Sequence, residues 1–450
     1  MSVRRTKVVA TLGPASSEPT QIAALVEAGA DVLRLNCSHL TTERMVELVR
    51  RVRDVAPTTA VLVDVQGPKM RYAGPAVTTA EGEERNLGWR EMGFDGPEAL
   101  GHVGEGHRVL VHDGKVELRV LRAAAGTLRV RVVRPGPMSP GNGVNLPDAV
   151  VGGELLARKD LDDLDAARAA GVDWVAISFV QRPDDVARVR SIVGEGVGIL
   201  AKIERPQALE RIDEICAVTD AVMAARGDLG VELPYEGVPA AQHRIAAAAL
   251  QHGVVSVCAT EMLESMLSSN RPTRAEVADV TAAVRDGFDA VMLSGETAVG
   301  ADPVGAVRAM VAICEAADAS MSPNTRFAEV NPERAAVTAA AASLARRVGA
   351  RLILALTFTG FSARLMAACR PELTIVAATP RVEHLRRLRL VRGVLPVVAE
   401  RPERLSQAID HALGAVRRQR LVVPGDRVVV CASRAHPRSD ADTVWLHTEP

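Results

Sequence analysis

Eight short apolar segments, each followed by polar residues, recur along the first two thirds of the chain and constrain its fold more than any other feature. Apolar residues at helical spacing follow most of these segments. Buried strands that alternate with helices are typical of a parallel sheet, because a helical crossover makes consecutive strands parallel. The segments are residues 7–12, 31–35, 60–63, 174–179, 198–201, 221–224, 254–258 and 290–293. Eight such units predict a (β/α)8 barrel, with its active site at the carboxyl ends of the strands.

The fifth and sixth segments are the most informative, because each ends abruptly in charged residues. Residues 206–218 between them have helical spacing and are predicted to form one helix. Both charged clusters should therefore emerge at the same edge of the sheet. The clusters are Lys202 with Glu204, and Arg226 with Gly227 and Asp228.

Glu204 and Asp228 are candidates for holding a divalent cation, Mg2+ or Mn2+, because hard cations take carboxylate oxygens and keep positions open for substrate. Lys202 would add a fixed positive charge beside the ion. Either cluster alone is more typical of an ordinary polar loop end. Their coincidence at one edge favours the metal site.

The alternation of strand-like and helical segments stops between residues 72 and 142, where apolar residues alternate with polar ones. Residues 109–111, a turn at 112–114 and residues 116–120 predict a β-hairpin. We interpret the segment as an inserted small β-barrel domain. Since it follows the third strand, it would lie over the mouth of the barrel as a lid that excludes water. The barrel would then comprise residues 1–71 and 143–318.

A further α/β domain is predicted for residues 335–450, after a polar linker at 319–334. It contains five strand-like runs separated by helical stretches, which predicts an open doubly wound sheet. Hydroxyls and amides at the start of its first strand-to-helix turn could bind the phosphate of an effector. Simple helix capping explains the same residues at least as well. They are Thr357, Thr359, Gly360 and Ser362.

Composition limits the classes of partner. The net charge is −1, Lys and Arg are scattered, and aromatic residues make up only 2% of the chain, so neither nucleic acid nor an anionic membrane is an expected partner. The six cysteines form no Cys-x-x-Cys pair. No apolar run approaches the roughly 20 residues of a membrane helix, and the N-terminus does not resemble a signal peptide. We therefore expect a cytoplasmic protein.

Seven segments resemble pyruvate kinase in order and spacing, and the resemblance covers nearly the whole chain. They are TKVVATLGPAS at 6–16, AGADVLRLNCSH at 28–39, AKIERP at 201–206, ARGDLGVE at 225–232, ATEMLESM at 259–266, RPTRAE at 271–276 and MLSGETA at 292–298. The resemblance implies transfer of a phosphoryl group from phosphoenolpyruvate to ADP in glycolysis. It also implies a homotetramer, with a sugar phosphate or a nucleoside monophosphate as effector.

The resemblance also implies roles for individual residues. Glu204 and Asp228 would bind the metal ion that holds phosphoenolpyruvate, Lys202 would stabilise the enolate and the transferring phosphoryl group, and Arg34 would bind the phosphate. Thr260 would lie near the face on which the enol carbon is protonated. The amides of Ala225, Arg226, Gly227 and Asp228 would hold the substrate carboxylate, and Asn36, His39 and Arg71 would contact the nucleotide.

Lys69 marks a departure from the members of this family that need K+. Those members tend to carry a glutamate at this position, and here Val65 and Gln66 also replace a threonine and a lysine. We predict that the Lys69 ammonium, near Asn36, Ser38 and Asp64, replaces the K+ ion, so that K+ is not required. The alternative is a loop lysine that points into solvent.

Other departures lie near the predicted nucleotide and substrate. The segment that ends at Asn142 lacks a lysine that the family usually has, Asp148 replaces a usual glycine, and Glu261 stands where glutamine is common. Two alternatives to a pyruvate kinase remain. One is a metal-dependent aldolase or lyase that acts on a pyruvate enolate, and the other is a degenerate paralogue that senses phosphometabolites.

Overall fold

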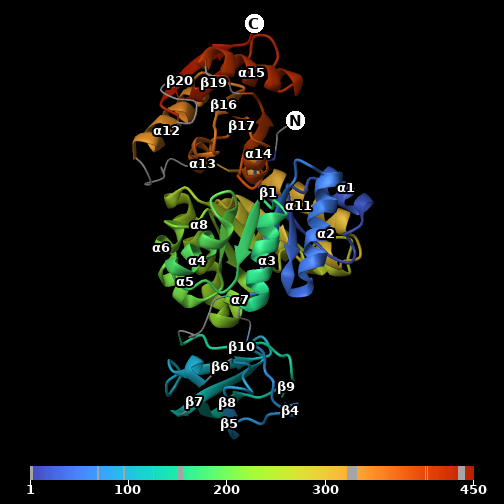
Figure 1. Ribbon diagram of the computed structural model, residues 1–450, viewed down its shortest axis with the longest axis vertical. Helices are drawn as coiled ribbons and strands as arrows, with labels where there is room; N and C mark the ends of the chain where they lie inside the picture. The colour runs from blue at the N-terminus through green and yellow to red at the C-terminus, as the bar shows by residue number, and fades with distance from the viewer. Residues whose placement is uncertain are drawn as a thin grey trace.

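A computed structural model describes residues 4–67, 70–94, 97–124, 126–149, 156–321, 332–400, 402, 404–433 and 441–450. Three parts follow one another along the long axis of the molecule (Figure 1). The barrel lies in the middle, the insertion lies at one end, and the C-terminal α/β part lies at the other.

Among the described residues, eight parallel strands close into a barrel in the order β1-β15-β14-β13-β12-β11-β3-β2. The predicted fold class is therefore confirmed. The strands are β1 (Lys7–Leu12), β2 (Val32–Asn36), β3 (Ala60–Asp64), β11 (Trp174–Ile177), β12 (Gly198–Ile203), β13 (Ala221–Ala225), β14 (Val255–Ala259) and β15 (Ala290–Leu293).

Helices surround this barrel and bury one face each against it. Buried apolar side chains recur along α2, whose Met45, Leu48, Val49 and Val52 lie in the core. The helices are α1 (Pro19–Glu27), α2 (Thr42–Val55), α3 (Arg158–Ala169), α4 (Pro183–Val193), α5 (Pro206–Glu210), α6 (Ile212–Cys216), α7 (Arg226–Glu232), α8 (Val238–His252), α9 (Arg274–Asp286), α10 (Gly295–Ala298) and α11 (Pro303–Ala319). Short 3-10 turns are η1 (Cys37–His39), η3 (Tyr235–Gly237) and η4 (Glu264–Leu267).

The single helix predicted for residues 206–218 is wrong, because two short helices occupy this range. Arg211, with φ −104° and ψ 23°, leaves the helical conformation between α5 and α6. Ala208, Ile212 and Ile215 are nevertheless all buried. The apolar spacing continues across the break, so the pattern could not reveal it.

Small and branched side chains fill the barrel, in keeping with the scarcity of aromatic residues. The fully buried interior includes Val9, Leu62, Leu200 and Val257. Trp174 is the exception in size, and a Cβ added at Gly198 would lie 2.4 Å from its ring. Glycine at 198 therefore makes room for the indole.

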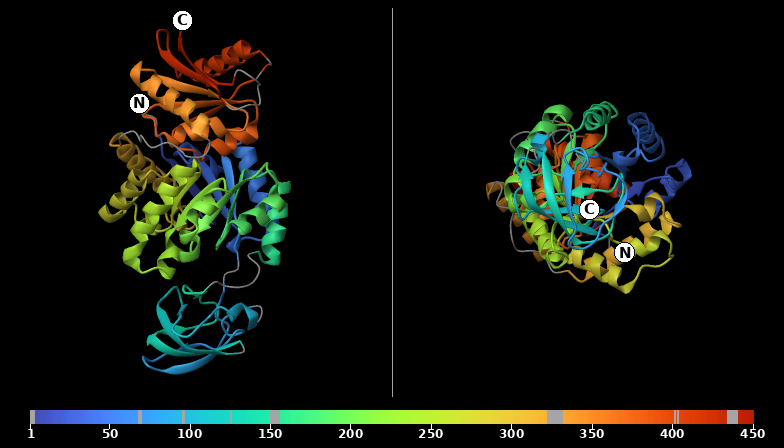
Figure 2. Two further views of the ribbon diagram at one scale, coloured as in Figure 1. Left: turned by 90° about the vertical axis from the view of Figure 1, so that its left-hand side faces the viewer. Right: turned by 90° about the horizontal axis from the view of Figure 1, so that it is seen from below.

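The insertion contains a five-stranded sheet in the order β10-β6-β7-β8-β5 and a two-stranded sheet of β4 and β9. Its elements are β4 (Val77–Thr78), β5 (Glu84–Gly88), η2 (Pro97–Leu100), β6 (Arg108–Val111), β7 (Val116–Ala124), β8 (Thr127–Arg134), β9 (Pro137–Met138) and β10 (Val144–Asn145). Since β10 pairs with β6, the inserted sheet extends past the predicted boundary at residue 142. The views of Figure 2 place the insertion below the barrel and across its axis, on the side of α7.

The C-terminal part is an open sheet in the order β18-β17-β16-β19-β20, parallel except for β20. The five predicted strands are all present. The elements are α12 (Pro332–Arg347), β16 (Leu352–Leu356), α13 (Phe361–Ala368), β17 (Thr374–Thr379), α14 (Val382–Leu388), β18 (Val394–Val398), α15 (Leu405–Arg418), β19 (Arg427–Ala432) and β20 (Thr443–Thr448). Helices α13 and α14 face the barrel (Figure 1). Most of the predicted linker lies outside the described residues, and the domain limits stay a prediction.

Across the described ranges, no helix has both the length and the apolar character to span a bilayer.

Candidate active site

The carboxyl ends of the barrel strands carry the residues that the sequence singled out. Arg34 lies in β2, Lys202 in β12 and Asp228 in the first turn of α7, which follows β13. Glu204 follows β12 and Thr260 follows β14. All five stand in or after the carboxyl-terminal part of a strand, and α7, which follows β13, lies on the side of the barrel where Figure 1 draws the insertion.

Asp64, at the end of β3, binds two of the predicted cations. Its Oδ2 accepts a hydrogen bond from Arg34 Nε at 2.8 Å, and Arg34 Nη2 lies 2.7 Å from the same oxygen. Lys202 Nζ lies 3.6 Å from Asp64 Oδ1. Thr11 Oγ1 accepts a further bond from Arg34 Nη1 at 3.0 Å. Arg34 and Lys202 are thereby brought to one place and fixed there.

Lys202 makes two closer contacts. Its Nζ donates to Ser178 Oγ at 2.8 Å and lies 2.8 Å from Glu204 Oε1. Burial alone would lower the pKa of this ammonium, but the charges of Asp64 and Glu204 outweigh burial and raise that pKa. Lys202 is therefore a permanently charged group.

Glu204 is fully buried, and its Oε2 accepts the Phe179 amide at 2.7 Å. Burial raises the pKa of Glu204, and the charge of Asp228 raises it further, while Lys202 opposes both. A divalent cation bound by carboxylate oxygens would offset the repulsion that Asp228 exerts on Glu204. Among the described residues no cluster of three or more His, Cys, Asp or Glu side chains could hold a metal.

The turn from β13 into α7 presents the amides that were predicted to hold the substrate carboxylate. The Gly227 amide donates to Thr260 Oγ1 at 2.7 Å. The Arg226 side chain is used elsewhere: its Nη2 donates to Thr260 O at 2.7 Å, and its Nη1 donates to Asp279 at 2.7 Å. Arg226 thus braces the end of β14, and only its amide is left for a ligand.

Thr260 has an unusual backbone, with φ +70°, and Glu261 follows with φ +54°. Left-handed conformations cost free energy in residues other than glycine, and such costs concentrate at functional sites. The Thr260 hydroxyl donates to Ala259 O at 2.6 Å and accepts from Gly227. Thr260 therefore links the ends of β13 and β14 at the mouth.

Of the three predicted nucleotide contacts, Asn36 lies beside the ionic centre, whereas His39 and Arg71 are exposed. Asn36 Oδ1 accepts the Ser38 amide at 3.2 Å, and His39 is exposed at the end of η1. Arg71 is exposed and its Nη1 donates to Gly141 O at 3.0 Å, within the connection to the insertion. Asn36 ends β2 beside Asp64, with which it pairs in the sheet.

Lys69 lies outside the described residues. Two of its predicted neighbours have other partners: Asp64 binds Arg34 and Lys202, and the Ser38 amide bonds to Asn36. Another ammonium, which the sequence did not single out, lies beside Cys37. Lys159 Nζ donates to Cys37 O at 2.8 Å and pairs with the buried Asp163 at 2.5 Å.

The predicted effector loop, Thr357 to Ser362, is largely engaged inside the C-terminal part. Thr357 and Ser362 are buried. Thr357 Oγ1 accepts the Gly360 amide at 2.9 Å, and Ser362 Oγ accepts the Ala441 amide at 3.1 Å. Thr359 is exposed, and its hydroxyl accepts the Phe361 amide at 3.4 Å. The N-cap of α13 is Gly360, with no side-chain cap, so these bonds brace the turn before the helix and the segment after β19, and they leave Thr359 as the accessible hydroxyl.

The connection to the insertion contains contacts that the sequence did not reveal. Asn145 Nδ2 donates to Glu232 Oε1 at 2.9 Å, and Arg205 Nη2 lies 3.9 Å from the same oxygen. Asp148 accepts the Arg108 amide at 2.8 Å and pairs with its guanidinium at 2.6 Å. Asp148, which replaces a usual glycine, therefore ties the connection to β6.

The chain is similar to known families and proteins over nearly its whole length. The family described as "Pyruvate kinase, barrel domain" matches residues 3–307, and "Pyruvate kinase, alpha/beta domain" matches residues 335–447. A pyruvate kinase of Methylorubrum extorquens is 41% identical over 448 residues, which are 95% of this chain and 94% of that protein. One of Agrobacterium vitis is 39% identical over 449 residues, with 95% and 93% covered. One of Mycobacterium tuberculosis is 37% identical over 466 residues, with 99% and 98% covered.

These matches define an enzyme of the kinase class, built on an α/β barrel with an ionic site at its mouth. Within that class, the chain belongs to the pyruvate kinase family. The resemblance seen in the sequence is confirmed.

Proposed function

We propose that this enzyme transfers the phosphoryl group of phosphoenolpyruvate to ADP, giving pyruvate and ATP, with Mg2+ or Mn2+ as cofactor. The observation that carries the proposal is the convergence of Arg34, Lys202, Asp64 and Glu204 at the end of the barrel that faces the insertion. Phosphoryl transfer depends mainly on positioning and on neutralisation of spread negative charge. Two fixed cations beside paired carboxylates supply both.

Arg34 would bind the phosphate, because Asp64 and Thr11 hold its guanidinium in one orientation. Lys202 would balance the charge of the enolate that is left when the bond between phosphorus and the enol oxygen breaks. Glu204 and Asp228 would hold the divalent ion, which neutralises charge on the substrate oxygens when bound. A β-phosphate oxygen of ADP would accept the phosphoryl group.

The enolate carbon would then take a proton on the side of Thr260. The amides of Ala225, Arg226 and Asp228 would hold the carboxylate, and the Gly227 amide would join them by leaving Thr260 Oγ1, its partner in this structure. A Cβ at Gly227 would lie 3.5 Å from Thr260 Oγ1, an ordinary contact, so the fold itself leaves room for a side chain there. A ligand that approaches the backbone closely would explain why glycine occupies this position. Asn36, His39 and Arg71 would contact the nucleotide.

Activity without K+ is part of the proposal. It rests on the sequence at Lys69, Val65 and Gln66, and on the abundance of fixed cations around Asp64. An effector bound near Thr359, and assembly as a homotetramer, are further expectations from the family.

A coupled assay of pyruvate formation, run with and without ADP, tests the proposal. Pyruvate should form only when phosphoenolpyruvate, ADP and Mg2+ are all present. Pyruvate formed from other acids without ADP would favour the aldolase or lyase. A folded protein that binds phosphometabolites but forms no pyruvate would favour the sensor.

A further inference from the structure

Four aspartates occupy equivalent positions at the amino-terminal face of the barrel, immediately before β2, β11, β13 and β15. Each donates its amide to the carbonyl of a residue in the preceding barrel strand, and its carboxylate accepts the amide of that same residue. The distances from amide nitrogen to carboxylate oxygen are 2.9 Å for Val8 with Asp31, 2.8 Å for Val61 with Asp173, 3.0 Å for Ile199 with Asp220, and 3.0 Å for Ser256 with Asp289. The four side chains therefore anchor the starts of β1, β3, β12 and β14.

Three of these anchors also bind arginines of the C-terminal part. In Asp173 and Asp220, Oδ2 accepts the strand amide and pairs with an arginine of the barrel, Arg53 or Arg190. Their Oδ1 atoms pair with the arginines of the C-terminal part. The contacts are Asp173 with Arg386 at 2.7 Å, Asp220 with Arg387 at 3.3 Å and with Arg364 at 3.5 Å, and Asp289 with Arg370 at 3.0 Å. The C-terminal part thus docks on the residues that fix the barrel strands.

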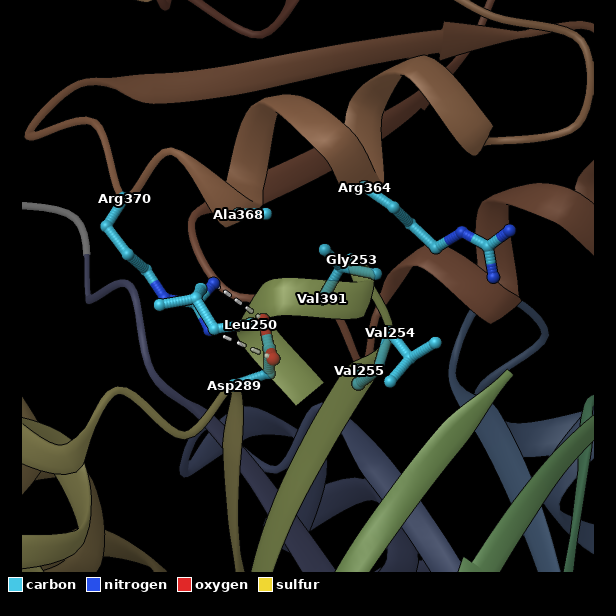
Figure 3. Close-up of a pocket in the computed structure, with 9 residues that line it drawn as sticks. All are labelled: Leu250, Gly253, Val254, Val255, Asp289, Arg364, Ala368, Arg370 and Val391. Atoms are coloured by element: carbon cyan, nitrogen blue, oxygen red, sulfur yellow. Dashed lines mark hydrogen bonds and ion pairs between the residues drawn. The ribbon is translucent and has the colours of Figure 1, made fainter. Parts of the chain in front are cut away.

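We call these contacts of Asp173, Asp220 and Asp289 with C-terminal arginines the seam. Helix α13 is held at both ends by the seam. Arg364 near its start and Arg370 just after its end project in different directions, and Figure 3 shows Arg370 paired with Asp289 beneath the helix. The cavity between them, also lined by Leu250 and Val391, has a volume of about 10 Å³, room for about one water molecule. A seam packed this closely transmits a shift of α13 rather than absorbing it.

The anchored strands carry the site at their other ends. Lys202 lies three residues beyond Ile199 in β12, a span of roughly 10 Å at strand geometry. Glu204 follows the same strand, and Thr260 follows β14, which Asp289 anchors. Both strands are hydrogen-bonded on each side, so they move as units.

We infer that Asp220 and Asp289 are positioning residues, through which the C-terminal part sets where β12 and β14 begin and hence where Lys202, Glu204 and Thr260 stand. The inference rests on the proposed function, because it assumes that these three residues serve the divalent ion and phosphoenolpyruvate. A change at the loop of Thr357 to Ser362, which leads into α13, reaches the site by this route.

Two substitutions separate this role from simple packing. Asp220→Asn keeps an acceptor for the Ile199 amide but removes the charge that Arg364 and Arg387 share with Arg190 of the barrel, so Arg364→Met is the variant that acts on the C-terminal contact alone. Arg364→Met keeps the aliphatic stem and removes the cation. Arg417→Met is the matched control, because Arg417 pairs with Glu449 inside the C-terminal part.

The measurements are kcat, the half-saturating concentration of phosphoenolpyruvate, the Kd of Mn2+ by electron paramagnetic resonance, and the melting temperature. In Asp220→Asn and Arg364→Met, half-saturation and the Mn2+ Kd should rise about threefold or more, with kcat within about twofold. The double variant should be no worse than Asp220→Asn alone, since the ion pair that Arg364→Met removes is already lost in Asp220→Asn. The control should match the wild type.

Lower melting temperatures with unchanged half-saturation and Mn2+ binding would show a purely structural seam and overturn the inference. The Mn2+ measurement needs no turnover. A wild type that binds Mn2+ but forms no pyruvate would therefore contradict the proposed function alone, and the Mn2+ Kd of the variants would still decide the inference.

Discussion

Asp64 is the residue on which the charge balance of the site depends, because it holds both Arg34 and Lys202. With 1% of its surface exposed, it is shielded from water, so its pairing with two cations is stronger than a surface pair. The sequence placed Asp64 at a strand end but gave no sign of its partners. Those partners depend on the register between β2 and β3, which pairs Asn36 with Asp64.

Glu204→Gln should abolish most turnover while the protein stays folded. The substitution removes a charge from the predicted metal site, and burial already disfavours that charge in the wild type. We expect kcat/KM to fall at least about a hundredfold, equivalent to roughly 2.7 kcal/mol of barrier, with a melting temperature close to that of the wild type. Asp228→Asn should behave alike.

The matched control for this pair is Glu214→Gln, a substitution of an exposed carboxylate in α6. It should leave turnover unchanged. Near-normal activity of Glu204→Gln at saturating Mg2+ would remove this residue from the metal site.

Lys69 leads to the prediction that turnover does not depend on K+. Activity is measured in a buffer whose only monovalent cation is a bulky quaternary ammonium, and KCl is then added at constant ionic strength. The wild type should change little. Lys69→Glu, with Val65→Thr and Gln66→Lys if needed, should be impaired and partly rescued by K+. A rise of about tenfold or more in the wild type, equivalent to roughly 1.4 kcal/mol, contradicts the prediction.

At the residue scale, the sequence predicted the groups that end strands and missed those that act through the backbone. Lys202 and Glu204 follow an apolar run, so their place at the barrel mouth follows from parallel topology. The Phe179 amide, which binds Glu204, depends on a left-handed backbone with φ +58°. A phenylalanine gives no sign of such a conformation in sequence.

At the element scale, the effector loop shows how packing limits what a motif can do. The hydroxyls of Thr357 and Ser362 are buried and bound to the Gly360 and Ala441 amides, whereas Thr359 is exposed. A carboxylate at the buried Ser362 would destabilise the C-terminal part, so the informative change lies at Thr359.

Thr359→Glu should abolish the response to a phosphorylated effector and leave the basal kcat unchanged. A fixed negative charge at the turn repels phosphate. Candidate sugar phosphates and nucleoside monophosphates are titrated against the phosphoenolpyruvate saturation curve, with Thr359→Gln as the uncharged control. If a compound shifts the curve of the wild type and of Thr359→Glu equally, the loop serves only as a helix cap.

The capping box of α9 illustrates a local feature that follows from residue spacing. Thr273 Oγ1 accepts the Glu276 amide at 3.2 Å, and Glu276 accepts the Thr273 amide at 2.6 Å, as the spacing of the two residues indicates. Local hydrogen bonds of this kind can be read from spacing. The break at Arg211 could not, because no glycine or proline marks it.

At the scale of the whole molecule, ionic contacts join the barrel to the C-terminal part. The sequence predicted the order of the parts, since each has its own periodicity. It did not predict the seam between the barrel and the C-terminal part, because residues as far apart as Asp173 and Arg386 meet there. Pairings between distant segments leave no trace in local spacing.

This seam predicts an acid-sensitive stability. Burial alone would raise the pKa of Asp220, but Arg387, Arg364 and Arg190 outweigh it and lower that pKa below its ordinary value of 3.8. The contribution of Asp220 is therefore complete above pH 3.8 and is lost as the pH falls further, through the pKa of the folded state.

The melting temperatures of the wild type and Asp220→Asn are compared between about pH 6 and pH 2.5. The wild type should melt higher at the upper end, and the difference should shrink only below about pH 4. Asp165→Asn, at an exposed pair within α3, serves as the control and should show little difference at any pH. If the difference in melting temperature between Asp220→Asn and the wild type is constant over the whole pH range, the negative charge of Asp220 does not stabilise the fold, and the prediction is wrong.

The central claim is that the cations and carboxylates at the barrel mouth transfer a phosphoryl group to a nucleotide. Phosphorus NMR of a mixture of phosphoenolpyruvate, ADP, Mg2+ and the enzyme tests it most directly. The account predicts loss of the phosphoenolpyruvate resonance with an equal gain of the γ-phosphate of ATP, and neither change with Glu204→Gln. Release of inorganic phosphate without ATP, or an unchanged spectrum with folded wild-type protein, would contradict it.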